Sequence, residues 1–558
     1  MLKLESLPLF FILLTVVAQG AGQSQPPSPA PMQQNATPTL HAESRLVLVD
    51  VVVKHHGAPV KGLTASDFIL LEDGKPQKIA FFDAHEGARA AADSQRVSTQ
   101  PDDFSNDTAE APSSVNVILF DTLNTPSRDQ PYARKQMIQF LKTLPPGYHV
   151  ALFELGARLR MLTGFSQTSE ELVAAANKLA PHVSSLLETD EDILQEQRLI
   201  DKSKTPYNGA SVATMQQFVK ETSVASAQNR VRLTLVGLNA LTGAMSGFHG
   251  RKNVIWLSEY FPVSFGLMTD NGRFSDTRSY GDLIRNTAST MSSSQVALYP
   301  IDVRGLASGF LADASLDGGP ADTVSSIRDI EARHVGMDDI AAQTGGHAYY
   351  NTNDLRFAMQ RSLESGSEYY TLAFVPPNGS DSKYHRIDVR FTRSGLSSEH
   401  RNGYFAVPIK SSLNPATDFA AAVQPATPVL NRLHLKAHLQ LPGPQDPNIR
   451  VECTIRPEDL TFVDQPSHRK FVRLHLLTVT WDKYLNTVAK ASNTLELRFS
   501  PEQYARALRD GITTRQEMRL TKPGRYDLRI AVMDDGNSRI GSLEIPFEIS
   551  SESKLAKK

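Results

Sequence analysis

Asp121 is the residue whose type and position most clearly suggest chemistry. It ends the apolar run 115–120 (VNVILF), which is typical of a buried parallel strand, and Thr125 follows four residues later. Glu259 stands just past a second apolar run, 253–257 (NVIWL). Because parallel strands end at one edge of a sheet, we expect Asp121 and Glu259 to lie close together. Carboxylate and hydroxyl oxygens suit a hard cation such as Mg²⁺, so the pattern predicts a metal site.

Asp121 also has a structural interpretation, in which it caps the following helix or accepts hydrogen bonds from loop amides. Other chemical patterns are weaker. The GxxSG stretches at 243–247 and 305–309 do not have the GxSxG spacing of a nucleophile elbow. Cys453 is the only cysteine, so an internal disulfide is excluded, and no Cys/His cluster indicates a zinc site.

The elements around Asp121 alternate between strand-like and helix-like patterns. This alternation predicts an α/β fold with a doubly wound parallel sheet. The expected strands are 115–120, 149–153, 253–257 and 295–301, with further strands near Ala348 and Tyr370; the expected helices are 127–144, 170–179, 231–245, 280–293 and 337–343.

Short β-rich segments flank this unit, and polar, Pro-rich or Ala-rich stretches separate the parts. We expect a small N-terminal β module and a C-terminal β-sandwich. The predicted division is a signal peptide 1–22, a disordered linker 23–43, a β module 44–86, a linker 87–114, an α/β domain 115–376 with a helical insertion near 181–227, a β extension 377–411, a linker 412–428, a sandwich-like domain 429–550 and a tail 551–558.

The N-terminus has the features of a secretory signal. Lys3 precedes the apolar run 7–18 (LPLFFILLTVVA), which is too short for a typical membrane span and is followed by small residues. We expect the segment to be cleaved and the protein to be secreted or to lie in the periplasm or cell envelope; an uncleaved N-terminal anchor is the alternative. An exported chain without a cysteine pair fits a bacterial envelope.

The composition limits the class of protein further. The 558 residues are 40% hydrophobic and 21% charged, which is enough for several folded units with cores of their own. The net charge of −2 argues against a dedicated nucleic-acid binder. No stretch after the N-terminal run is long and apolar enough to predict a membrane span.

The order of elements, with the strands VNVILFDTLNT and VIWLSE, resembles a von Willebrand factor type A domain. With its RLVLVDVVV and PGRYDLRIAVMDD segments, the whole chain resembles the type A-related secreted proteins of Acidobacteria. The family's metal-ion-dependent adhesion site reads Asp-x-Ser-x-Ser, then a distant Thr and a later Asp. Asp121 matches the first acid and Thr125 the last Ser, while Leu123 replaces the first Ser and Glu259 the later Asp. The distant Thr has no clear counterpart near 222–226.

The resemblance implies a non-enzymatic protein that binds a protein or cell-surface ligand through the loops after the sheet strands. It implies at most weak Mg²⁺ or Mn²⁺ binding at Asp121, Thr125 and Glu259, because Leu123 cannot ligate a cation, and no other cofactor. Two alternatives stay open: a hydrolase that uses the same edge of the sheet, and a metal-independent structural scaffold. No nucleophile–base pairing in the sequence supports the hydrolase.

Overall fold

The structure is a computed structural model that describes residues within the range 46–549. The residues of this range that it does not describe are 87–102, 107–113, 146, 167, 188–189, 206, 249, 260–276, 306–333, 378–380, 382, 407–414, 426, 442–447 and 521. The predicted signal segment, the linker 23–43 and the tail 551–558 lie outside the described residues. In the described part of the chain, no helix is long and apolar enough to cross a membrane.

A five-stranded sheet of order β11-β10-β7-β8-β9 forms the centre of the α/β unit. The first four strands in this order run parallel, and β9 is an antiparallel edge strand. A parallel bridge from Ile301 to Tyr349 continues the sheet beyond β11. The strands are β7 (Ser114–Asp121), β8 (Val150–Leu155), β9 (Leu159–Ser166), β10 (Arg251–Ser258) and β11 (Val296–Asp302).

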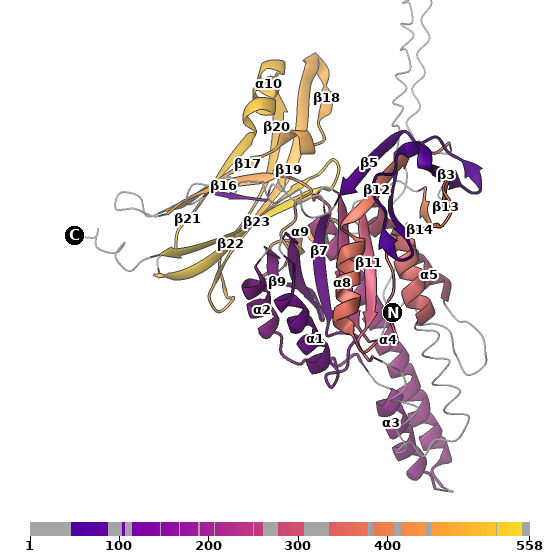
Figure 1. Ribbon diagram of the computed structural model, residues 1–558. Helices are drawn as coiled ribbons and strands as arrows, with labels where there is room; N and C mark the ends of the chain where they lie inside the picture. Colours follow the sequence, from indigo (N-terminus) through magenta and orange to yellow (C-terminus); the bar gives the residue numbers. More distant parts are fainter. Residues whose placement is uncertain are drawn as a thin grey trace, which may run out of the picture. The chain divides into compact units, whose positions relative to one another are not determined.

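Helices cover both faces of this sheet, as Figure 1 shows. One face packs against α1 (Gln130–Lys142), α2 (Ser169–Asn177) and α8 (Leu355–Ser365). The other packs against α4 (Gly209–Met245), α5 (Thr277–Ser293) and helical residues 334–344. The four parallel strands bury both of their faces, because helices lie on both sides, and this explains their continuous apolar runs. The α/β prediction is confirmed at this level.

Two antiparallel sheets enclose a separate hydrophobic core. Their strands come from the segments that precede and follow the α/β unit in the sequence. One sheet has the order β14-β1-β12-β5 with β2 beside β1, and the other has the order β15-β13-β3-β4. Their strands are β1 (Val47–His55), β2 (Ala58–Pro59), β3 (Phe68–Glu72), β4 (Lys75–Pro76), β5 (Phe81–Glu86), β12 (Glu368–Phe374), β13 (Tyr384–Phe391), β14 (Leu396–Glu399) and β15 (Gly403–Phe405). The α/β unit is therefore inserted within a β structure.

This arrangement differs in two respects from the one that the sequence predicts. The strand expected near Tyr370 is β12, and it pairs antiparallel with β1 and β5 instead of extending the parallel sheet. The predicted segments 44–86 and 377–411 also share one core. An apolar run identifies a buried strand but does not tell which sheet it joins, and this explains the difference.

The helical insertion forms a hairpin of two helices. The first is α3 (Asp190–Lys202), and the second is the N-terminal half of α4, which begins at Gly209 and not near Val231 as expected. Ile200 of α3 packs against Val212 and Val219 of α4. Most residues of this hairpin are polar, so its sequence shows no clear helical spacing of apolar residues.

Two further antiparallel sheets share one core toward the C-terminus. Their orders are β21-β17-β16-β6 and β18-β19-β22-β23, with β20 beside β19. The elements are β6 (Asp103–Ser105), β16 (Leu435–Gln440), β17 (Ile449–Ile455), β18 (Val463–Gln465), β19 (Arg469–Asp482), β20 (Thr487–Phe499), β21 (Ile512–Met518), β22 (Gly524–Asp534), β23 (Ile540–Ile549), α9 (Pro415–Ala421) and α10 (Pro501–Asp510), with 3₁₀ turns at Ala65–Asp67, Pro457–Asp459 and Pro466–His468.

Strand β6 comes from the segment 87–114, which the sequence analysis expected to be a linker. It pairs with β16, and the amide of Asn106 beside it donates to the carbonyls of Leu430 and Leu433 at 2.8 and 2.9 Å. Asn106 Oδ1 accepts from the backbone N–H of Leu435 at 2.6 Å. Three residues in a polar stretch give no strand signal, so only tertiary pairing reveals β6.

We expect limited proteolysis to cut first in the predicted linker, within 87–102 or 107–113, and to spare 103–106, because the latter backbone is paired. The fragment that carries β1 should stay bound after the cut, since β1 pairs with both β12 and β14. Gel filtration of the nicked protein under native conditions, followed by mass spectrometry, measures this. Elution of the N-terminal fragment on its own would contradict the shared core.

Candidate functional site

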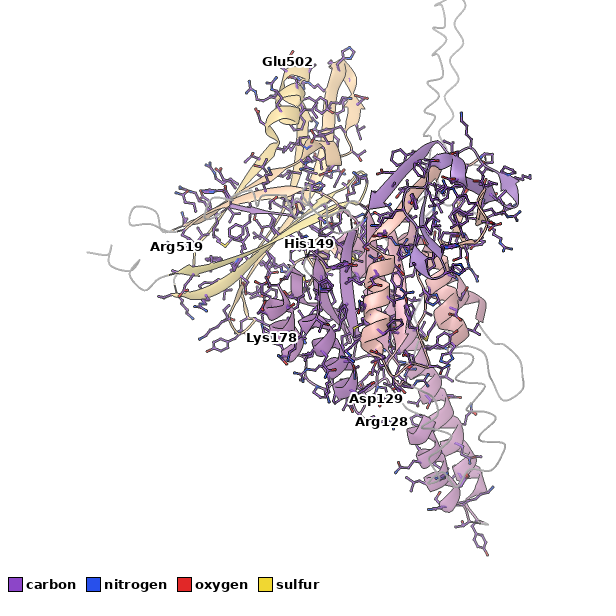
Figure 2. The ribbon with its side chains drawn as sticks, viewed as in Figure 1. Arg128, Asp129, His149, Lys178, Glu502 and Arg519 are labelled. Atoms are coloured by element: carbon purple, nitrogen blue, oxygen red, sulfur yellow. The ribbon has the colours of Figure 1, made fainter. Side chains whose placement is uncertain are left out.

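The candidate site lies at the carboxyl ends of β7 and β10, which are neighbours at the centre of the parallel sheet. The chain leaves β7 toward β8 on one side, while β10 lies on the other, so the strand order reverses here. Ligands of open α/β sheets bind at such a switch point. Figure 2 shows Arg128 and Asp129, which follow β7, at the end of the α/β unit opposite His149, which precedes β8.

The Asp121 carboxylate at the end of β7 accepts five hydrogen bonds. Oδ1 accepts from the backbone N–H groups of Leu123 and Asn124 at 3.0 and 2.9 Å. Oδ2 accepts from the Asn124 amide at 2.8 Å, and from Trp256 Nε1 and the Ser258 hydroxyl on β10 at 2.9 and 3.0 Å. This one side chain therefore shapes the loop after β7 and ties it to β10.

Asp121 is 1% exposed, and burial raises its pKa to about 6, although the hydrogen bonds from Asn124, Trp256 and Ser258 oppose the rise. A carboxylate with five donors has little capacity left for a directly bound cation. The geometry matches the structural interpretation of Asp121, in which it organises the loop amides.

Three other buried oxygens at this edge have no hydrogen-bond partner among the described residues: Asn124 Oδ1, Thr125 Oγ1 and Glu259 Oε2. Thr125 is 2% exposed and Glu259 is 3% exposed. Buried polar atoms are nearly always hydrogen-bonded in folded proteins, so an unpartnered group calls for an explanation such as an ion or a water molecule.

Glu259 has an unusual environment for a carboxylate. Burial and the neighbouring Asp129, which shares a hydrogen bond with it, raise the pKa of Glu259 to about 8, and Asp302 adds to the rise while Arg304 opposes it. At neutral pH, Glu259 therefore carries a proton. A neutral carboxyl group can donate a hydrogen bond, whereas a bound cation would require the proton to leave.

Asp302 ends β11, the next strand along the edge. Burial raises its pKa, but hydrogen bonds from His334 and Arg304 outweigh this and hold the pKa below its usual value. Arg304 Nε donates to Oδ1 of Asp302 at 3.1 Å, and Nη2 donates to Oδ2 at 2.5 Å. The charge of Asp302 is thus compensated within the chain.

Several functional neighbours were missed by the sequence analysis: Asn124, Asp129, Thr234, Trp256 and Ser258. Thr234, on α4, accepts a hydrogen bond from the Asn124 amide at 2.9 Å and donates to the carbonyl of Arg230. It lies eight residues after the end of the 222–226 segment, where the family's distant Thr was sought. Helix α4 runs unbroken through residues 222–226, and this explains why the spacing of residues in the sequence did not align Thr234 with the family's distant Thr.

Two of the three expected metal ligands keep a buried oxygen without a partner among the described residues. Thr125 Oγ1 and Glu259 Oε2 are buried oxygens without a partner, which is the donor chemistry that Mg²⁺ prefers. Asp121 is already saturated, and Leu123 is 2% exposed within the apolar cluster under the sheet. Within the described residues, no group of three or more His, Cys, Asp and Glu side chains is arranged to hold a metal ion.

No protein-family model and no curated protein matches the chain. Solved structures similar to it include an aerotolerance-related membrane protein of Bacteroides fragilis, with 14% identity over 45% of this chain and 98% of that chain and a TM-score of 0.22. A von Willebrand factor type A protein of Catenulispora acidiphila matches at 8% identity over 87% and 73%, again with a TM-score of 0.22.

Proximal thread matrix protein 1 of the mussel byssus, described with a zinc-occupied MIDAS motif, is also similar. Its identity is 10%, its coverage is 47% of this chain and 46% of that chain, and its TM-score is 0.22. Identities and TM-scores this low do not assign the chain to a family.

We expect Asp121→Asn to lower the free energy of unfolding by about 2–4 kcal/mol, because an amide donor then faces donors on Asn124, Trp256 and Ser258. Thr125→Val, in the same loop, should leave stability unchanged or raise it by up to about 1 kcal/mol, since its hydroxyl lacks a partner. Urea titration at pH 7 in EDTA measures both. Equal losses in the two variants would contradict the role of Asp121.

The raised pKa of Glu259 predicts a pH dependence of stability. The folded protein holds a proton at Glu259 up to about pH 8, whereas the unfolded chain releases it near 4.5, so stability falls as pH rises toward 8. The slope is at most about 1.4 kcal/mol per pH unit. Glu259→Gln should remove most of this slope.

Urea titrations between pH 6.5 and 8.5 in EDTA test this, because the transition of Asp121 lies below that range. Exposed Glu170 supplies the matched control, and Glu170→Gln should keep the wild-type slope. An unchanged slope in Glu259→Gln would mean that Glu259 is ionised in the folded protein.

Proposed function

We propose that this protein is a secreted or cell-envelope interaction protein, in which a type A-like α/β domain binds a protein or cell-surface ligand. The loop after β7 and Glu259, which directly follows β10, form the binding edge. One observation carries the proposal: Thr125 Oγ1 and Glu259 Oε2 are buried at the switch point without partners in the described chain. Oxygens left in this way suit an external group that completes their coordination.

In this proposal Thr125 and Glu259 would bind Mg²⁺ or Mn²⁺ weakly, and Asp121 would hold the loop that presents Thr125. A bound cation would supply a positive centre that accepts a carboxylate of the ligand. Binding has to displace the proton of Glu259, so affinity should be low at neutral pH and rise as the pH approaches the pKa of about 8.

Export is part of the same proposal and depends on the sequence of residues 1–22. The affiliation with acidobacterial type A-related proteins is also part of it and depends on the RLVLVDVVV and PGRYDLRIAVMDD segments. The near-neutral net charge and the absence of a spanning helix in the described chain are compatible with it. The partner in this view is a protein or surface ligand and not nucleic acid.

A hydrolase is the main alternative, and the described residues at the edge give it little support. The hydroxyl of Thr125 lacks a hydrogen bond to any base, and the hydroxyl of Ser258 donates to Asp121 within a network that holds the loop. A metal-independent scaffold becomes the better description if no cation binds at any pH.

Cation titration tests the proposal directly. We expect calorimetry of the full chain with Mg²⁺ and Mn²⁺ to give weak binding at pH 7, and binding about fivefold tighter at pH 8, because a larger fraction of Glu259 has then lost its proton. Glu259→Gln should abolish the signal, and Thr125→Val should weaken it.

Leu123→Ser restores the family pattern but also removes a buried leucine side chain, so we expect it to destabilise the fold by about 2–4 kcal/mol. Glu170→Gln serves as the control with wild-type affinity. Absence of binding to wild type at both pH values would contradict the metal-dependent part of the proposal.

A further inference from the structure

Strand β20 is a long edge strand of the C-terminal sheets. It has 13 residues and forms a hairpin with β19, to which it is paired from Lys470–Phe499 to Trp481–Thr487. Among the described residues β20 pairs with no other strand, so its second edge presents backbone N–H and C=O groups over about 44 Å. An edge of this length is a template for another strand.

The usual protections of an edge strand are few here. β20 contains no proline, and the register irregularity lies next to the turn, between Thr480 and Trp481. Its only charged residues are Lys490, Glu496 and Arg498. Most of its side chains are exposed; only Ala489, Leu495, Leu497 and Phe499 are partly buried.

We propose that β20 pairs antiparallel with β20 of a second copy of this chain, with Asn493 on the two-fold axis. Asn493 is the midpoint of the strand, so this register gives full-length overlap. The same register places Lys490 opposite Glu496, twice by symmetry. Overlap and charge complementarity thus select one register.

Neighbouring registers lack this agreement. A shift of two residues in one direction places Lys490 opposite Thr494, and a shift in the other direction places it opposite Arg498, which is repulsive. Shifts by one residue would place the face of one strand that carries Leu495 and Leu497 beside the face of the other that carries Lys490 and Glu496. The symmetric pairing around Asn493 is the one that brings both lysines to glutamates.

The side chains on the two faces are compatible with this pairing. Lys490 and Glu496 share one face, on which Arg473 of β19 also contacts Glu496 at 2.9 Å. On the other face, Ala489 would lie opposite Leu497, and Ala491 opposite Leu495. Leu495 and Leu497 already pack against the core, so the paired strand would extend an existing apolar surface.

A single cysteine at the two-fold axis tests the register. We expect Asn493→Cys to form a covalent dimer on mild oxidation, because residue 493 faces its own copy at a Cα separation of about 4.5–5.5 Å, within disulfide range. Val488→Cys is the matched control on the same strand; its thiol faces Arg498 and not its own copy, so it should form no covalent dimer. The native Cys453 is buried, 2% exposed, and does not compete.

Charge reversal tests the pairing without a covalent bond. By sedimentation velocity on the full chain, Lys490→Glu and Glu496→Lys should each weaken the dimer at least about tenfold, because each places like charges opposite each other twice. An equimolar mixture of the two variants should dimerise again, since both cross-strand pairs become Glu–Lys. Lys483→Glu, in the turn of the hairpin, should behave as wild type.

Wild-type protein that stays monomeric across the concentration range would overturn the proposal. So would a dimer in which Asn493→Cys does not cross-link or the mixed variants do not recover association, since either result assigns the interface to another surface. These outcomes are independent of cation binding at the α/β unit.

Discussion

A carboxylate enclosed by protein must collect hydrogen bonds to offset the loss of water, and Asp121 collects five of them at the centre of the parallel sheet. Two come from the backbone of the loop after β7, one from Asn124 and two from β10. The loop that presents Thr125 therefore depends on a group that is itself unavailable to a ligand. Asp121 therefore supports the loop, and the buried oxygens without a partner in the described chain belong to Asn124, Thr125 and Glu259.

Glu259 shows the opposite balance. It is as buried as Asp121 but lacks comparable donors, and the nearby Asp129 adds a like charge, so a proton stays on it at neutral pH. A proton and a divalent cation compete for the same oxygen. Glu259 is thus uncharged at neutral pH, and it becomes charged only when the pH rises or a bound cation displaces its proton.

The sequence predicted the α/β unit and the positions of Asp121 and Glu259 at the carboxyl ends of β7 and β10, because apolar runs followed by polar residues are local patterns. It did not predict which sheet β12 joins, since the run EYYTLAF is apolar whichever partner it has. The five donors around Asp121 were equally hidden, because Trp256 and Ser258 reach it only through the pairing of β10 with β7. The raised pKa of Glu259 depends on its burial and on its proximity to Asp129, and the sequence shows neither.

The insertion of the α/β unit between β5 and β12 has a consequence for the order of folding. Strand β1 leaves the ribosome long before β12 and β14, the strands on either side of it in the sheet, because more than 300 residues separate them. The α/β unit can fold as soon as its own strands are complete, whereas the first strands must wait as an exposed apolar segment. Chaperone dependence and aggregation during synthesis should therefore concentrate on β1–β5, and truncation before β12 should leave β1, β3 and β5 without their later partners β12, β13 and β14.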